Sequence, residues 1–308
     1  MKTASGGPGQ RGKAVEWPTL TLLVLCYGVW GLSTTWLATV SVPLAILGVG
    51  LSACLHSSLS HEVIHGHPFR RQWLNAALVF PALTLIVPYL RFAATHRAHH
   101  RDEVITDPYD DPESNYQDPA VWARLPYWLR DVMQANNTLL GRILIGPVVG
   151  TLAFLRLEWI ALRAGNRDVA RGWLWHLPAL ALVVWWQINV AQIPLWALLS
   201  GTYLAHSILK IRTFLEHRAH MRPRARTVII EDRGLLALLF LNNNFHVVHH
   251  MHPQRPWYDL PALYAKRRAH YLARNDGYVY RSYAEVFLRY FCRAKDPVPH
   301  PLWRAPPQ

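Results

Sequence analysis

Nine of the seventeen histidines in this chain form an ordered series of short clusters. In chain order the clusters are His61-x-x-x-His65, His96-x-x-His99-His100, the single His217 and His246-x-x-His249-His250. Neutral imidazole is the commonest metal ligand in proteins, and residues i, i+3 and i+4 of a helix share one face. Nine such ligands exceed the need of one ion and suit two. The series therefore predicts a dinuclear metal centre, with no catalytic residue separate from it.

The second and third clusters share the form His-x-x-His-His. Adjacent residues on a helix point about 100° apart, so we expect each adjacent pair to serve two neighbouring ions, and each His-x-x-His pair to share one ion. An all-nitrogen ligand set suits iron, zinc or copper. Such a site also needs carboxylates that orient the imidazole rings. The candidates for that role are Glu62, Asp107, Glu216 and Asp232.

Two long uncharged segments must position these clusters. No Asp, Glu, Lys or Arg occurs from Trp17 to Ser60 or from Trp173 to Leu209. A helix needs roughly 20 apolar residues to cross a bilayer, so each segment can cross, turn and cross back. We therefore predict an all-α, integral-membrane helical bundle with four transmembrane helices and a cytoplasmic helical cap that carries the metal site. The predicted spans are residues 18–35, 39–59, 173–190 and 193–211.

The formal net charge of +13 is explained by this topology. Basic residues precede the first predicted span, surround the first two clusters and follow the last span. They are Lys2, Arg11, Lys13, Arg70, Arg71, Arg91, Arg97, Arg101, Lys210, Arg212, Arg218, Arg222, Arg224 and Arg226. If the chain makes two hairpins, all of them lie on one side, which is the positive-inside pattern and puts the histidines on the cytoplasmic side of the membrane. The same distribution argues against nucleic acid as a partner.

Two further apolar stretches, residues 72–90 and 139–155, lie between the two pairs of spans. A crossing by the first would put His96 on the opposite side of the membrane from His61, and its two prolines would interrupt a straight helix. We therefore expect residues 72–90 to lie in the interface or to re-enter from the same side, and residues 139–155 to be interfacial as well. A six-span arrangement in which the two stretches pair is the alternative.

One membrane domain, residues 17–300, accounts for most of the chain, between a polar N-terminal tail (1–16) and a C-terminal tail (301–308). The acidic, proline-rich segment 101–127 is expected to be a solvated surface loop rather than a part of the site. Residues 257–290 mix helical apolar spacing with many Arg and Tyr, and they predict a helical cap against the membrane.

The histidine clusters resemble those of a known family. Their order and their spacing about the spans are similar to the integral-membrane fatty acid desaturase family, whose superfamily includes alkane monooxygenases and carotenoid hydroxylases and ketolases. The segment NNNFHVVHHMHPQRPWYDLP, residues 242–261, resembles the third histidine box of that family with the Pro-x-x-Pro-Trp-Tyr-x-Leu-Pro sequence that follows it. Leu-Glu-His217-Arg resembles the extra histidine before this box. The resemblance covers most of residues 50–300.

This resemblance implies a di-iron centre, O2 as co-substrate and electrons from a separate donor, which would be a ferredoxin, a rubredoxin or a cytochrome. It implies that the iron ligands are His61, His65, His96, His99, His100, His217, His246, His249 and His250. It also implies a polar residue near the site at Asn242, with Asn243 or Asn244 as alternatives. The implied activity is oxidation of a lipid-like chain, first as fatty acyl desaturation and second as hydroxylation of an acyl, alkyl, carotenoid or other lipid substrate.

Two other functions fit parts of the pattern. His61-Glu62-Val-Ile-His65 also spells HExxH, the zinc-protease signature with the glutamate as general base, but it leaves seven of the nine histidines unexplained. A metal transporter would also place histidine-rich loops beside spans. Transport sites, however, lie near the midplane with polar residues inside the spans, and the predicted spans here hold few.

The remaining histidines are expected to be structural or solvated. They are His56, His67, His176, His206, His220, His252, His270 and His300. Among them His67 and His252 lie two residues beyond their clusters and off the shared face. His220 is the alternative to His217, and His206 is a candidate for lining a substrate cavity.

Overall fold

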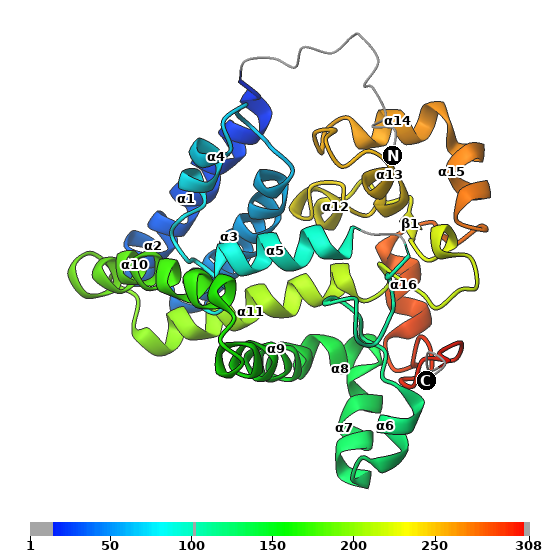
Figure 1. The fold of residues 1–308 in the computed structure, drawn as a ribbon. Helices are drawn as coiled ribbons and strands as arrows, with labels where there is room; N and C mark the ends of the chain where they lie inside the picture. The colour runs from blue at the N-terminus through cyan, green and yellow to red at the C-terminus, as the bar shows by residue number, and fades with distance from the viewer. Residues whose placement is uncertain (1–14, 101–102, 305–308) are drawn as a thin grey trace.

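The computed structural model describes residues 15–100 and 103–304. Lys2, Arg11, Lys13 and Arg101 lie outside the described residues, as do most of the predicted N-terminal tail and the second half of the predicted C-terminal tail. Within the described part the chain is mainly α-helical. The long helices on the left of Figure 1 are α1 (Trp17–Thr34), α3 (Val42–Ile64), α10 (Arg167–Asn189) and α11 (Leu195–Thr213).

The first two long helices form a hairpin through the short helix α2 (Trp36–Val40). The segment made of α1 and α2 has a mean hydropathy of 1.5 and α3 one of 1.7, and both are long and apolar enough to cross a membrane. These two candidate spans agree with the predicted spans 18–35 and 39–59. The second helix, however, continues to Ile64, so His61 lies on the helix itself rather than beyond its end.

The second pair of long helices, α10 and α11, occupies the positions predicted for the spans 173–190 and 193–211. Helix α11 packs along α3, and glycines allow the two backbones to approach closely. A Cβ added at Gly201 would lie 2.6 Å from Val49 Cγ1, and one at Gly50 would lie 2.7 Å from Leu204 Cδ2. In the described part of the chain only the first hairpin meets the hydropathy expected of a membrane span. The four-span arrangement therefore stays a prediction.

The stretch 72–90 does not cross the molecule. It contains the seven-residue helix α4 (Gln72–Leu78), then an irregular segment, and then the start of α5 (Tyr89–His99). At about 1.5 Å per residue, α4 is too short to cross a hydrocarbon core of about 30 Å. His176 on α10 and His206 on α11 hold the irregular segment through the carbonyl groups of Leu85 and Thr84, at 2.9 and 3.0 Å. The stretch therefore contains no single helix long enough to cross a membrane, as the four-span prediction expects.

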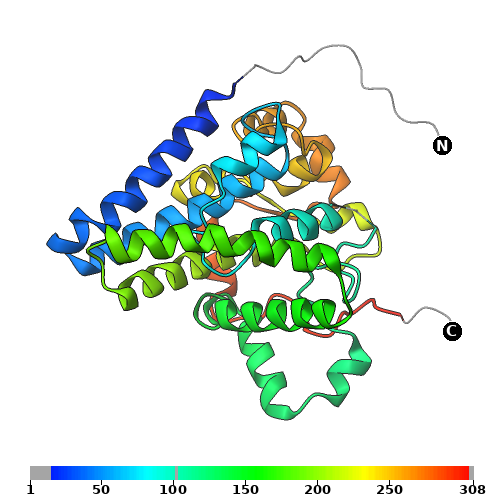
Figure 2. The ribbon, with the colours of Figure 1, turned by 60° about the vertical axis from the view of Figure 1, so that its left-hand side comes forward.

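The stretch 139–155 forms α8 (Leu139–Leu144) and most of α9 (Gly146–Arg163). In Figure 2, α9 runs beside α10. Before them, α6 (Pro119–Arg124) and α7 (Tyr127–Asn136) make a hairpin that projects from the lower edge of both views.

Short elements build the C-terminal cap on the right of Figure 1. They are η1 (Pro223–Ala225), β1 (Ile229–Ile230), α12 (Leu235–Leu239), α13 (His246–Met251), α14 (Leu260–Lys266), α15 (Arg268–Arg274), β2 (Val279–Tyr280) and α16 (Tyr283–Tyr290). The two strands are parallel and pair Ile229 with Val279. Phe245, Val248 and Tyr271 belong to the buried apolar cluster beneath α13, α14 and α15. This core fixes α13, which carries the last histidine cluster.

Candidate metal centre

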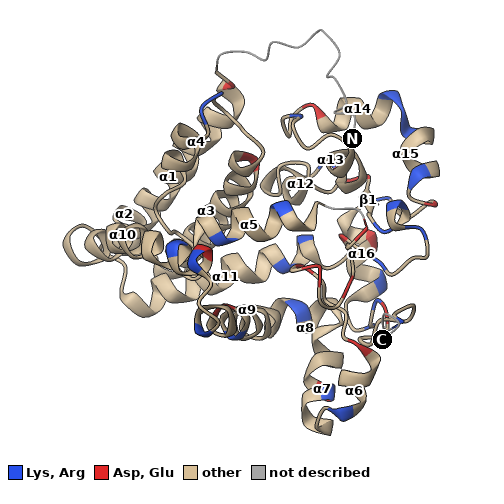
Figure 3. Cartoon of the chain, in the orientation of Figure 1, with Lys and Arg blue, Asp and Glu red and all other residues tan. Residues whose placement is uncertain are grey.

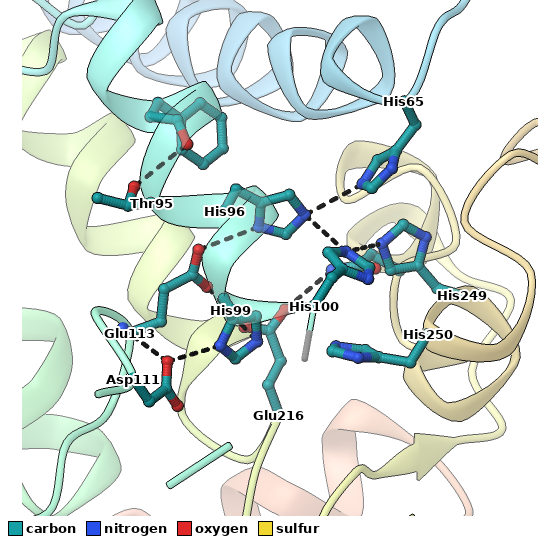
Figure 4. A network of polar contacts seen from close by, with 12 residues as sticks. His65, Thr95, His96, His99, His100, Asp111, Glu113, Glu216, His249 and His250 are labelled. Carbon is teal, nitrogen blue, oxygen red and sulfur yellow. Dashed lines mark hydrogen bonds and ion pairs between the residues drawn. The ribbon is translucent and has the colours of Figure 1, made fainter. Parts of the chain in front are cut away.

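All nine histidines of the sequence series meet at one place, where the ends of α3, α5 and α13 and the segment after α11 come together. Figure 4 shows part of this set, with His65, His96, His99, His100, His249 and His250 labelled. They form two groups. The five-histidine group contains His61, His65, His96, His100 and His249, and the four-histidine group contains His99, His217, His246 and His250. Within each group one ligand nitrogen per residue lies within 4.8 Å of every other.

The division of each cluster differs from the expectation. His96 and His100 share a group while His99 lies in the other, so the i, i+4 pair stays together and the i, i+3 pair is divided. Adjacent histidines are separated, as predicted. Side chains four residues apart on a helix differ in direction by about 400°, which leaves them about 40° from pointing the same way. Side chains three residues apart differ by about 300°, which leaves them about 60° apart in the opposite sense. The idea that His-x-x-His shares one ion position was therefore wrong, because these short helices lie between the two groups and serve both.

The spacing of the ring nitrogens fits metal ligands. The distances between Nε2 atoms in the five-histidine group are 3.1 Å for His65 and His96, 2.9 Å for His96 and His100, and 3.1 Å for His100 and His249. In the four-histidine group they are 2.8 Å for His99 and His217, 3.1 Å for His217 and His246, and 3.2 Å for His246 and His250. Metal–imidazole bonds of about 2.0–2.1 Å at right angles place two nitrogens about 2.9 Å apart. The donor set therefore fits a cation in each group.

Hydrogen bonds at the opposite ring nitrogens define how three of the rings are protonated. The Nδ1 atoms of His96, His99 and His246 contact Glu113 Oε1 at 3.0 Å, Asp111 Oδ1 at 2.7 Å and Asn243 Oδ1 at 3.2 Å. Carboxylate and amide oxygens accept hydrogen bonds, so each Nδ1 carries a proton and each Nε2 is the nitrogen left to bind a cation. The three Nε2 atoms point into the groups, where a cation would be stabilised.

Burial keeps most of these rings neutral. It lowers the pKa of His65 to about 2 and that of His100 to about 3, and neighbouring histidines act in the same direction. The same two causes lower the pKa of four further imidazole rings well below the ordinary value for histidine. These belong to His217, His246, His249 and His250. Neutral imidazole is the form that binds metal, so the site is ready to bind a cation at neutral pH.

His99 behaves differently because two carboxylates lie beside it. Burial alone would lower its pKa, but Glu113 and Asp111 raise it to about 9. In the reverse direction, His99 and His96 lower the pKa of Glu113, although burial opposes this. The surroundings of His99 therefore favour a positive charge, and a metal cation on Nε2 would supply it.

Asp111 and Glu113 were missed as site residues, because they lie in the segment 101–127 that was expected to be a solvated loop. Asp111 is buried, and its second oxygen accepts the backbone N–H of Thr106 at 2.9 Å. The signal that could have identified them is their position 12 to 17 residues after the histidines they contact. A ligating histidine needs an acceptor for its other nitrogen, and the acidic residues that follow α5 are the nearest carboxylates in the chain.

Glu216 and Glu62, two of the predicted orienting carboxylates, lie at the site in different ways. Glu216 Oε1 is 3.0 Å from Arg212 Nε and accepts a hydrogen bond from Asn243 Nδ2 at 2.9 Å. Since Asn243 also contacts His246, it connects Glu216 to the four-histidine group. Glu62 lies 4.0 Å from Nδ1 of His61 and accepts the backbone N–H of Trp257 at 3.2 Å.

The other three predicted polar residues have different partners. Asn242 donates to the carbonyl oxygen of Trp257 at 3.1 Å, so its alternative Asn243 is the asparagine that contacts a histidine. Asp107 and Asp232 accept backbone N–H groups, including those of Tyr109 and Gly234. The remaining eight histidines lie outside both groups, and His220, the alternative to His217, instead pairs with Asp276 at 3.2 Å.

The part of the chain that carries the histidine groups is similar to known proteins. The family model described as Fatty acid desaturase matches residues 34–283, a range that contains all nine histidines. A beta-carotene ketolase of Paracoccus sp. (strain N81106 / MBIC 01143) is 28% identical over 223 residues, which cover 71% of this chain and 76% of the relative. A beta-carotene ketolase of Paracoccus sp. (strain PC1) is 27% identical over 273 residues, which cover 82% of this chain and 94% of the relative.

Proposed function

The chain belongs to the fatty acid desaturase family, and from this we propose that it is a di-iron membrane enzyme that uses O2 to oxidise a lipid-like substrate. The observation that carries the proposal is the convergence of nine buried or half-buried histidines into two groups with ligand spacing. Oxidation of a C–H bond with O2 requires a strong oxidant in a site closed to water.

We assign one iron to each group. His61, His65, His96, His100 and His249 would hold the first, and His99, His217, His246 and His250 the second. Bound there, the irons would supply the chemistry by which O2 and electrons from an outside donor remove hydrogen from a C–H bond. The protein residues orient the ligands: Glu113, Asp111 and Asn243 hold the Nδ1 protons, so that each Nε2 faces inward.

We further propose that α10 and α11 cross the membrane together with the first hairpin, so that the histidines lie on the cytoplasmic side. Large apolar side chains point outward along both helices, among them Leu174, Trp185, Ile188 and Trp196. Exposed apolar patches of this size on a soluble surface would cause association, whereas a bilayer covers them. The basic residues at the histidine end support the same orientation. A separate one-electron donor then reaches the site from the cytoplasm.

For the substrate, we propose a carotenoid as the first candidate, because two similar proteins that cover most of this chain are both beta-carotene ketolases. The reaction would add oxygen at a methylene, which is the hydroxylation alternative of the sequence analysis. Acyl desaturation, the first expectation from the sequence, is the second candidate, and the description of the family model favours it.

One experiment separates the two candidates. The chain is expressed in a bacterial host that makes β-carotene, and pigments and acyl chains are measured by mass spectrometry, with His99→Ala and His249→Ala as inactive controls. We expect a carotenoid that has gained oxygen, and an acyl chain lighter by two hydrogens would select desaturation instead. Iron-loaded protein that makes neither product would overturn both.

A further inference from the structure

A strongly basic surface surrounds His252 at the end of α13. Residues 252–274 contain five Lys and Arg and one Asp. Arg255, Arg267, His270 and Arg274 lie near enough to interact electrostatically with His252. Lys266, Arg267 and His270 are exposed. We call this surface, made of His252, Arg255, Lys266, Arg267, His270 and Arg274, the basic cap surface.

The basic cap surface faces water rather than lipid. Figure 1 places α14 and α15 at the opposite end of the molecule from α2 and the turn between α10 and α11, and Figure 3 shows basic positions along α15 at that edge. Among the described residues 239–287, no large apolar side chain is exposed, in contrast to α10 and α11. Basic segments that bind lipid usually carry apolar anchors beside the charges. A soluble, negatively charged partner fits this surface better than a membrane does.

The same surface is close to the histidine groups through His252. Its backbone N–H donates to the carbonyl oxygen of His249 at 3.1 Å, within one turn of the helix that carries both groups' ligands. Its ring lies 6.2 Å from the ring of the buried Tyr271, edge to face, and Tyr271 lies 5.6 Å from the exposed His270. Aromatic rings therefore connect the outer surface to α13, with the basic residues around their outer end.

We propose that the basic cap surface is the docking site for an acidic one-electron carrier protein, and that electrons enter the metal centre by way of His252. This inference rests on the proposed function, because it supplies that function with its electrons. Each docking event would oxidise the carrier by one electron and reduce the centre by one. Two events would supply the two electrons of one O2-dependent oxidation, and no proton need pass through this surface.

Carrier binding tests the docking part without any need for substrate. The iron-loaded chain is placed in nanodiscs of uncharged lipid, and binding of an acidic ferredoxin is measured at low and high salt. We expect Lys266→Glu/Arg267→Glu to weaken binding by about tenfold or more and to reduce its salt dependence, because charges at an interface mainly steer association. Arg281→Glu/Arg293→Glu, which reverses two exposed charges elsewhere in the C-terminal region, should bind normally.

Reduction kinetics test the entry route. Iron reduction by the bound carrier should slow by about tenfold in His252→Leu, while carrier binding and reduction by dithionite remain unchanged. Unchanged binding of the Lys266→Glu/Arg267→Glu variant would overturn the docking site. The docking site would also be overturned if the basic cap surface bound nanodiscs of anionic lipid and the chain did not bind the carrier. A chain that binds and accepts electrons but oxidises no lipid would contradict the proposed function and leave this inference standing.

Discussion

His99 and Asp111 are in contact through Nδ1 and Oδ1 at 2.7 Å, and both side chains are buried. This contact joins the second histidine cluster to an acidic loop 12 residues later in the chain. It determines which nitrogen of His99 faces the four-histidine group, and it brings a negative charge beside a candidate metal ligand.

We predict that Asp111→Asn lowers iron affinity by about 10- to 100-fold, the usual cost of losing a partner that orients a metal ligand. The amide can still accept a hydrogen bond, but the negative charge that favours a cation on His99 is lost. Iron affinity is measured by competition with a chelator. Asp110→Asn, at an exposed position in the same loop, is the matched control. Equal iron affinity in both variants would contradict an orienting role for Asp111.

The ion pair of Arg91 and Glu158 should be essential for holding α5 in place. Two contacts of 2.8 and 2.9 Å join the guanidinium to the carboxylate, and Trp173 donates to the same carboxylate at 3.0 Å. Because Arg91 would remain largely buried without a partner, we expect Glu158→Ala to reduce the free energy of unfolding by about 3–5 kcal/mol. Thermal unfolding in detergent measures the loss.

A double variant separates the ion pair from simple packing. Arg91→Met/Glu158→Met replaces both charges by apolar side chains, so it leaves no buried charge without a partner. We expect it to be clearly more stable than Glu158→Ala. If the double variant is as unstable as the single one, the loss comes from packing and not from the unpaired arginine.

Metal-free protein should lose stability below neutral pH. Six candidate ligands outside the proposed spans have a lowered folded pKa, to about 3 for His100 and about 2 for His65. Their contributions are present above the unfolded pKa of about 6.5 and are lost as the pH falls towards the folded values, by up to about 1.4 kcal/mol per pH unit for each histidine.

His99 acts in the opposite sense, because its raised pKa of about 9 gives a contribution that is complete below about 6.5 and lost as the pH rises through 9. One such residue does not offset six. We therefore expect the unfolding temperature of chelator-treated protein to be higher at pH 7.5 than at pH 5.5. An unfolding temperature that stays constant or rises at pH 5.5 would show that the buried rings are already protonated.

The helices and site residues that depend on a local sequence pattern, such as an uncharged run or a fixed histidine spacing, could be predicted from the sequence. The uncharged segments gave the long helices, and the histidine spacing identified all nine residues that converge. Which histidines share a group was predicted wrongly, because i and i+4 residues of a helix lie closer to alignment than i and i+3 residues, and α5 and α13 lie between the two groups. Asp111 and Glu113 were missed because an acidic, proline-rich composition is typical of solvated loops, and only the tertiary fold turns this loop inward.

The packing of α3 against α11 should determine whether the histidine end of α3 stays in place. At Gly201 an added Cβ would lie 2.6 Å from Val49 Cγ1 and 3.0 Å from the carbonyl oxygen of Ile46, so the helices must move apart. We expect Gly201→Ala to destabilise the fold by about 1–3 kcal/mol, the usual cost of overpacking. Gly28→Ala is the matched control, since nothing lies within 4 Å of its added Cβ. The control should be neutral or stabilising, because alanine favours a helix over glycine by about 1 kcal/mol. Equal unfolding temperatures for Gly201→Ala and Gly28→Ala would mean that α3 and α11 do not need this close approach.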